Sequence, residues 1–189
     1  DSVRLFILSD SPPEKDVQWS DEGMKSSYKF IQKLWILNKK IIDEIKMNHP
    51  LSPDNSIEKI SNQFVKNVTN NIENFSYNKI VANFHETYAK LSKIISNKIE
   101  KSKLIHNYKN ILIAMSPVIP HFSSECLEML GKTDEILWPK INEDILKDKK
   151  VNFVIQINGK TRAIFKENKD ITEETLTLKI NENLKLKKY

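Results

Sequence analysis

The residues best suited to metal binding or nucleophilic catalysis are four histidines and a single cysteine. The histidines lie in four separate segments, at positions 49, 85, 106 and 121, and none has the spacing with a glutamate that a zinc-binding helix needs. Cys126 is the only cysteine, so it cannot form an intrachain disulfide, and its apolar neighbours predict a buried side chain. We therefore expect no metal site in this chain.

Sequence patterns for nucleotide and acyl chemistry are also missing. Three glycines among 189 residues provide no Gly-rich phosphate loop, and no serine stands in a Gly-x-Ser-x-Gly setting. Residues 24–27, Met-Lys-Ser-Ser, are partly similar to the ATP-binding loop Lys-Met-Ser-Lys-Ser, but they lie in a predicted helix and lack its first lysine. Glu125 and Glu128 are one helical turn apart, and an exposed acidic face explains them better than paired acid–base catalysis. We predict no catalytic and no cofactor-binding residue here.

The basic charge of the chain is concentrated near its end. The chain has a net charge of +5, and 28 of its 30 basic residues are lysines. Residues 1–146 carry 19 basic and 19 acidic side chains, whereas residues 147–189 carry 11 basic and 6 acidic ones. A basic terminal module is typical of a unit that binds a polyanion, and a solvated Lys-rich tail is the alternative.

The sequence contains neither a signal peptide nor an apolar run near the ~20 residues that a membrane span requires. Together with the single cysteine, this predicts a cytoplasmic protein in a reducing compartment, with no membrane contact.

Apolar residues recur at three- and four-residue steps over most of the first 131 residues, which predicts amphipathic helices. Ser20 is a good N-cap for a long helix to about Met47, in which Ile31, Leu34 and Trp35 lie on the core face. Asp54 is a good cap for a third helix, and Gly131 is suited to end the last one. The predicted helices cover residues 1–8, 20–47, 54–72, 80–95, 102–115 and 122–130. Short connections between them favour an antiparallel bundle.

The pattern changes after Trp138-Pro139. Residues 151–157 and 161–165 are rich in β-branched and aromatic side chains, and Asn158-Gly159 between them predicts a hairpin with a type I′ turn. Thr172 is expected to cap a last helix that reaches about Leu186. Two strands and one helix provide too little sheet for independent stability, so we expect an incomplete module. The predicted fold class is mainly α, with an antiparallel bundle followed by a small, incomplete α+β module.

Three ordered motifs carry a resemblance to a known family. Residues 1–35, DSVRLFILSDSPPEKDVQWSDEGMKSSYKFIQKLW, resemble the segment that follows the ATP-binding signature loop in bacterial leucyl-tRNA synthetases. Residues 113–121, IAMSPVIPH, are similar to the Ala-Pro-x-x-Pro-His turn of the helical domain in that family. Residues 153–162, FVIQINGKTR, are similar to the hairpin that begins its C-terminal domain. The motifs His-Ile-Gly-His and Lys-Met-Ser-Lys-Ser, the amino-acid pocket and the editing domain of the family are absent.

The resemblance implies a fragment with three parts. Residues 1–20 would end the connecting helix and loop from a catalytic domain, residues 21–146 would form a bundle of the class Ia anticodon-binding type, and residues 147–189 would form part of a C-terminal tRNA-binding domain. It implies tRNA(Leu) and the upstream catalytic and editing domains as partners, in a monomer. The parent enzyme would be an ATP-dependent leucine–tRNA ligase that uses ATP with Mg, whereas the fragment alone would be inactive and hold no cofactor.

The residues expected to contact tRNA are basic. Lys160 and Arg162, beside the hairpin turn, are the first candidates, because a guanidinium suits phosphate better than an ammonium does. Further candidates are Lys149, Lys150, Arg4 and Lys15. Solvated charges are the alternative for the hairpin pair, and packing or surface roles are the alternative for Arg4 and Lys15.

Two other interpretations of the chain stay open at this point. The first is a stand-alone RNA-binding or tRNA-chaperone protein, and the second is a purely structural helical bundle. Trp19 is expected to be a core anchor at the junction between the bundle and the catalytic domain rather than an RNA-stacking platform, and His121 is expected to terminate a helix and bond to its backbone.

Overall fold

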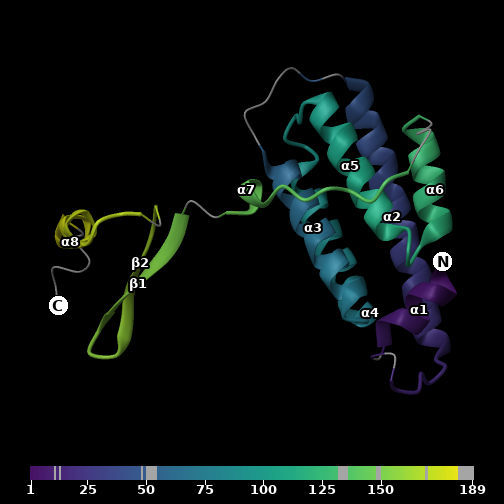
Figure 1. Ribbon diagram of the computed structural model, residues 1–189, viewed down its shortest axis with the longest axis horizontal. Coiled ribbons are helices and arrows are strands. Elements are labelled where there is room, and N and C mark those ends of the chain that lie inside the picture. Colours follow the sequence, from purple (N-terminus) through teal and green to yellow (C-terminus); the bar gives the residue numbers. More distant parts are fainter. Residues whose placement is uncertain are drawn as a thin grey trace. The chain divides into compact units, whose positions relative to one another are not determined.

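The computed structural model describes residues 1–10, 12, 14–47, 49, 55–131, 136–147, 150–168 and 170–182. The chain divides into two compact units, Asp1–Leu146 and Lys147–Tyr189. Figure 1 traces the described helices and strands of both units.

The first unit is a helical bundle. Its main helices are α1 (Ser2–Asp10), α2 (Asp21–Met47), α3 (Ser56–Glu73), α4 (Tyr77–Ile94), α5 (Lys101–Met115) and α6 (Pro120–Met129). α3 packs against both α4 and α5, α1 packs against α2 and α4, and α6 packs against α2 and α5 (Figure 1). The predicted mainly α fold, with a bundle followed by a hairpin and a helix, is confirmed.

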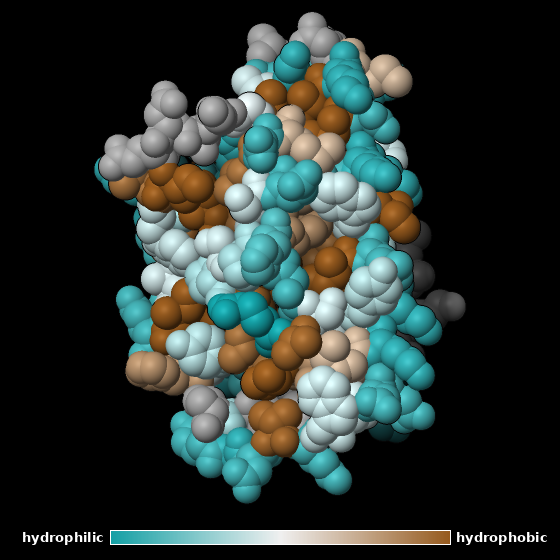
Figure 2. Space-filling model, turned by 90° about the vertical axis from the view of Figure 1, so that its right-hand side faces the viewer, coloured by the Kyte–Doolittle hydropathy of each residue, from teal (hydrophilic) through white to brown (hydrophobic). Residues whose placement is uncertain are grey.

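The core is formed by the predicted apolar stripes of these helices. Ile41, Val68, Ile80, Phe84 and Ile111 are completely enclosed, with 0% of their surface exposed. Burial of each such side chain contributes about 1.5–3 kcal/mol to folding. The exterior is mixed: Figure 2, which views the bundle from the side of α1 and α6, shows apolar patches separated by polar residues rather than one continuous apolar surface.

The helix boundaries follow local chemistry. The hydroxyl of Ser20 accepts a hydrogen bond from the N–H of Gly23 at 3.1 Å, so the predicted N-cap of α2 is confirmed. Asp54, the predicted cap of α3, lies outside the described residues, and Asn55 occupies the N-cap position without a side-chain cap bond. Gly131 follows α6 with φ of +91°, and its N–H donates to the carbonyl of Glu128 at 3.0 Å.

After α6 the chain passes along α3. The indole N–H of Trp138 donates to the Thr69 hydroxyl at 3.0 Å, and Lys66 on α3 forms an ion pair with Glu143 at 2.8 Å. Glu143 begins α7 (Glu143–Leu146), a single turn that the sequence analysis did not predict. Four residues are too few to show a helical period.

The second unit contains β1 (Lys150–Ile157), β2 (Lys160–Asn168) and α8 (Glu173–Glu182). The strands pair antiparallel, and both turn residues have positive φ, +53° at Asn158 and +73° at Gly159, which matches the predicted type I′ turn. The N–H of Thr175 donates to the Thr172 hydroxyl at 3.4 Å, as expected for a cap of α8. The predicted helix end at Leu186 lies outside the described residues.

Candidate nucleic-acid interface

The outward face of α2 carries a row of lysines. Its buried side contains Phe30, Leu34 and Leu37, whereas all five lysines of the helix between positions 23 and 42 are exposed. Four of them, which we call the α2 lysine row, follow one another at spacings of four, four and seven residues, so they lie on one face: Lys25, Lys29, Lys33 and Lys40. The segment 23–42 contains no acidic residue. This face therefore presents unbalanced positive charge to solvent.

The charge of this row affects a neighbouring histidine. The ring of His85 on α4 stacks on Phe30 with 3.7 Å between ring centroids. Partial burial lowers the pKa of His85 below its usual value, and the positive charge of Lys33 lowers it further. His85 therefore adds little positive charge near neutral pH, and the electrostatics of this face come from the lysines.

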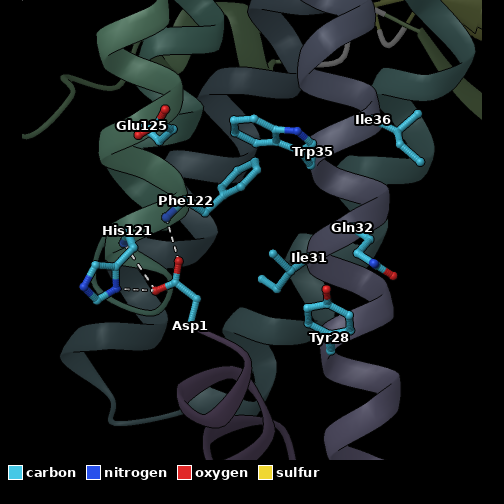
Figure 3. Close-up of a pocket in the computed structure, with 9 residues that line it drawn as sticks. All are labelled: Asp1, Tyr28, Ile31, Gln32, Trp35, Ile36, His121, Phe122 and Glu125. Carbon is cyan, nitrogen blue, oxygen red and sulfur yellow. Dashed lines mark hydrogen bonds and ion pairs between the residues drawn. The ribbon is translucent and has the colours of Figure 1, made fainter.

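An open groove lies on the α6 side of α2. It has a volume of about 740 Å³ and is lined by Tyr28, Ile31 and Trp35 of α2 and by Phe122 and Glu125 of α6, among others (Figure 3). The sequence analysis placed Trp35 in the core, but Trp35 is only half-buried. Helical periodicity locates the apolar face correctly, but Trp35 lies at the edge of that face.

The first turn of α1 is bonded to the corner between α5 and α6. Arg4 donates from Nε to the carbonyl of Val118 at 3.1 Å and from Nη2 to the carbonyl of Pro117 at 2.7 Å. The carboxylate of Asp1 accepts from the backbone N–H groups of His121 at 3.3 Å and Phe122 at 2.6 Å. It thereby caps α6 from a distant part of the sequence, and the guanidinium of Arg4 is engaged in binding carbonyl oxygens.

One prediction for an aromatic ring near these elements is wrong. His121 lies in the first turn of α6 rather than at the C-terminal end of a helix, and its Nδ1 lies 3.1 Å from the Asp1 carboxylate rather than against backbone. The sequence did not reveal this partner, because Asp1 is 120 positions away along the chain. Trp19 is 60% exposed; its ring packs edge-on against Phe6, and its indole N–H donates to Asp21 at 2.9 Å. Its expected place at a junction with a catalytic domain stays a prediction.

The hairpin candidates lie on the two strands of the second unit. Lys160 is exposed at the first position of β2, directly after the turn. The register shifts beside Gln156, which pairs with Thr161 while Ile155 pairs with Ala163. Arg162 is therefore the extra residue of a β-bulge, a feature that redirects a side chain, and it is half-buried with an interaction inside the chain.

The other predicted site residues are Lys150, Lys149 and Lys15. Lys150 is the first residue of β1, and its partner in the register is Asn168. Lys149 lies outside the described residues. Lys15 is exposed in the loop before α2, and the carbonyl of Pro12 accepts a hydrogen bond from its backbone N–H at 3.0 Å. Arg4 and Lys15 thus belong to the first unit, and the hairpin candidates belong to the second.

Within the described residues, three or more His, Cys, Asp or Glu side chains nowhere come together in a way that could hold a metal ion. In the same part of the chain, no helix has the length and hydropathy needed to cross a membrane. Cys126 is buried as predicted, and this burial, with Glu125 adding to it, raises the pKa of its thiol to about 12. It is therefore a protonated core residue rather than a nucleophile.

The sequence analysis missed the α2 lysine row, although a signal for it was present. Net charge was compared between the two ends of the chain, and residues 1–146 are neutral as a whole. A count restricted to residues 23–42 of the predicted α2 helix would have found five lysines with no acidic residue.

Comparisons with known proteins agree with the motifs. A family model described as the anticodon-binding domain of tRNA ligase matches residues 54–178. The leucine–tRNA ligases of Petrotoga mobilis and Orientia tsutsugamushi are 30% and 35% identical over stretches that cover 100% and 87% of this chain. The chain spans 25% and 20% of the length of these two relatives. The expected resemblance to leucyl-tRNA synthetases is thereby confirmed.

A solved structure also matches. It is the ternary complex of LeuRS with tRNA and LeuAMS from Agrobacterium radiobacter K84, with a TM-score of 0.79 and 18% sequence identity. The match covers 99% of this chain and 26% of that chain, and at this identity it shows a shared fold. Because the family model matches more than half of its residues, this chain belongs to the anticodon-binding domain family of tRNA ligases.

Proposed function

We propose that this chain is the tRNA-docking C-terminal part of a leucine–tRNA ligase. It holds tRNA(Leu) so that the 3′ end of the tRNA reaches a catalytic domain upstream, where leucine is activated with ATP and Mg and then transferred. The observation that carries the proposal is the α2 lysine row, in a domain of the anticodon-binding family. The whole-chain similarity to leucine–tRNA ligases supports leucine as the amino acid.

Docking of this kind contributes to the reaction through orientation. Fixing the acceptor end of the tRNA near the activated amino acid makes the transfer step effectively unimolecular. The binding energy of the tRNA thereby lowers the activation barrier of transfer. Lysines contact phosphates without reading bases, so the row positions the tRNA rather than identifying its sequence. The chain proposed here therefore needs no catalytic group of its own.

The second unit provides a second contact in this proposal. Residues 147–189 act as part of a tRNA-binding domain, in which the residues that contact the RNA are Lys160 and Arg162, together with Lys149 and Lys150. The net charge of +5 in this segment supports an attraction to phosphate. The bulge at Arg162 supports a specific direction for the guanidinium rather than a solvated strand end.

The remaining assignments are part of the same proposal. The partners are tRNA(Leu) and the catalytic and editing domains of one cytoplasmic, monomeric enzyme. The alternative is a stand-alone RNA-binding or tRNA-chaperone protein. The relatives support the docking role over this alternative, because each is a ligase of which the chain matches about a fifth to a quarter.

The test replaces Lys25, Lys29 and Lys33 with glutamine in the ligase that contains this chain. We expect the KM for tRNA in aminoacylation to rise, whereas leucine-dependent ATP–pyrophosphate exchange, which needs no tRNA, stays unchanged. A control variant replaces two lysines that are paired with carboxylates: Lys90, which is paired with Glu86 on α4 at 2.7 Å, and Lys46, which is paired with Asp43 at 3.3 Å. If the triple variant aminoacylates like the wild type, α2 does not dock the tRNA.

A further inference from the structure

The groove between α2 and α6 carries large apolar side chains that remain open to solvent. Tyr28 is 55% exposed and Ile36 is 56% exposed, although both belong to a helix whose inner face is buried in the core. Ile31 and Trp35 of the same helix are partly buried. On the opposite wall, Phe122 of α6 packs edge-on against Trp35, with 6.3 Å between the ring centroids (Figure 3). An exposed surface that is rich in aromatic side chains is typical of a place where another domain or protein packs.

The charged residues of this groove are acidic. Among the described residues that line it, Asp1 and Glu125 are acidic and none is a lysine or an arginine. The side chain of Asp1 is only 10% exposed and is held by backbone N–H groups of α6, whereas Glu125 is exposed one turn beyond Phe122. Lys39 lies 5.9 Å from the centre of the Trp35 ring but is not among these lining residues. Because RNA carries a negative charge on each phosphate, the Glu125 carboxylate disfavours RNA as the occupant.

The α2 lysine row lies on another side of the helix. Burial and then the positive charge of Lys33 lower the pKa of His85, so Lys33 lies near α4. Lys40 lines a small pocket together with Tyr88 and Ser92 of α4. The row therefore borders α4, whereas the aromatic groove borders α6. The two surfaces use different faces of α2, so an occupant of the groove does not take the place proposed for the tRNA.

An occupant is available within the same polypeptide. The chain spans 25% and 20% of the length of two leucine–tRNA ligases, so three quarters or more of each relative lies outside the matched part. In the proposed function this remainder contains the catalytic and editing domains. Parts of one polypeptide meet at a high effective concentration and lose less freedom on contact than a separate partner does. A segment of the ligase itself is therefore favoured over a partner from solution.

We propose that the groove between α2 and α6 binds a segment from the rest of the ligase, in which an apolar side chain stands next to a lysine or an arginine. The apolar side chain packs against the apolar wall of the groove, and the cation pairs with Glu125. Tyrosine and tryptophan, both present in this wall, are the residue types that often dominate the energy of an interface. The inference rests on the proposed function, because it requires a larger ligase, and it adds an interaction surface that does not contact tRNA.

The test is hydroxyl-radical footprinting, read by mass spectrometry, in the absence of tRNA. It compares the oxidation rates of the Tyr28 and Trp35 side chains in the 189-residue chain and in the ligase that contains it. We expect both rates to fall severalfold in the ligase, because the bound segment removes these side chains from solvent. Met47, which is 69% exposed on α2 and is not among the residues lining the groove, is the reference and should oxidise at the same rate in both proteins.

A charge reversal tests the chemistry of the occupant. Glu125→Lys in the ligase places a cation against the basic side chain of the segment and should raise the oxidation rates of Tyr28 and Trp35 toward those of the 189-residue chain. Glu125 is exposed, so the bundle should remain folded. Glu128→Lys is the matched control, because Glu128 is exposed on the same helix but is not among the residues lining the groove. It should leave both rates unchanged.

Three results would overturn the inference. Equal oxidation of Tyr28 and Trp35 in the chain and in the ligase would mean that no segment covers the groove. Protection that appears only after tRNA is added would identify RNA as the occupant. Protection that persists in Glu125→Lys would mean that the occupant is not basic.

Failure of the docking function gives a different pattern. It is judged from aminoacylation by the ligase with Lys25, Lys29 and Lys33 replaced by glutamine, whereas the footprint is recorded without tRNA. If the groove is protected and this variant aminoacylates like the wild type, the groove interface stands and α2 does not dock tRNA. If the KM for tRNA rises in the variant but the groove is unprotected, the docking function stands and the groove interface fails.

Discussion

Single residues in this bundle show why charge alone is a poor guide to an interface. Arg4 and the α2 lysines are equally basic in the sequence, but the guanidinium of Arg4 donates to two carbonyls while the lysines face solvent. Residue type predicts which chemistry is available. Whether a donor already has a partner depends on contacts such as that between Arg4 and Val118, which are 114 positions apart and leave no local trace in the sequence.

We predict that Arg4→Ala destabilises the fold and leaves RNA affinity unchanged. The carbonyls of Pro117 and Val118 would lose their charged donor, and Val118 is completely buried, so the loss should be about 1–3 kcal/mol in the free energy of unfolding. Urea denaturation measures this change. Arg4→Lys should restore little of the stability, because an ammonium does not reproduce the two-pronged donation of the guanidinium.

RNA binding by the same variants separates the two roles of Arg4. If Arg4 touches RNA through its charge, Arg4→Ala should weaken RNA binding in the folded protein and Arg4→Lys should restore it. This result would contradict a structural role and return Arg4 to the tRNA contacts.

Secondary structure was the most predictable level of this protein. The stripes of α2 to α5 follow a helical period, Ser20 caps α2, and Asn158-Gly159 forms the expected turn, because each depends on interactions within a few residues. The errors concern tertiary partners. His121 contacts Asp1 rather than backbone, and Trp35 borders a groove whose other wall is some 90 residues further along the chain. Periodicity places a residue on a face but does not tell how far a neighbouring helix covers that face.

The approach of α1 to α2 depends on Gly23. A Cβ atom at this position would lie 2.5 Å from Cε2 of Phe6, and Phe6 is only 5% exposed and rests against Trp19. The glycine at position 23 is therefore explained by close packing between the two helices.

We predict that Gly23→Ala lowers the free energy of unfolding by about 1–2 kcal/mol. Overpacking costs about 1–3 kcal/mol, whereas the better helix propensity of alanine returns at most about 1 kcal/mol. Chemical denaturation of the variant checks the sign. Ser26→Ala, at an exposed position of the same helix, is the matched control and should be neutral or slightly stabilising. A Gly23→Ala protein that is more stable than the wild type would show that the Phe6 ring moves aside without cost.

At the scale of the whole molecule, charge and packing are divided differently between the two units. The bundle encloses the large apolar core and is neutral overall, yet one of its faces is basic. Residues 147–189 contain no buried hydrophobic residue among those described, but they carry the entire net charge of +5. A comparison of net charge alone directs attention to the second unit, and only the arrangement of α2 reveals the basic face of the first.

If both units touch the same tRNA, their contributions to binding should add. Lys160→Ala with Arg162→Ala, in the ligase that contains this chain, should lower tRNA affinity and reduce the slope of log affinity against log salt by about 1.4–1.8, since each lost phosphate contact contributes about 0.7–0.9. Combined with the α2 triple variant, the reductions should sum, because mutations at separate sites without shared partners behave independently. Lys79→Ala with Lys101→Ala, two exposed lysines elsewhere in the bundle, removes the same charge and should change the slope much less.

Pyrophosphate exchange should be unaffected in every variant. If the hairpin variant lowers pyrophosphate exchange and aminoacylation equally, Lys160 and Arg162 support the fold. If it changes neither activity, α2 alone docks the tRNA, and the basic side chains of residues 147–189 are only a solvated surface.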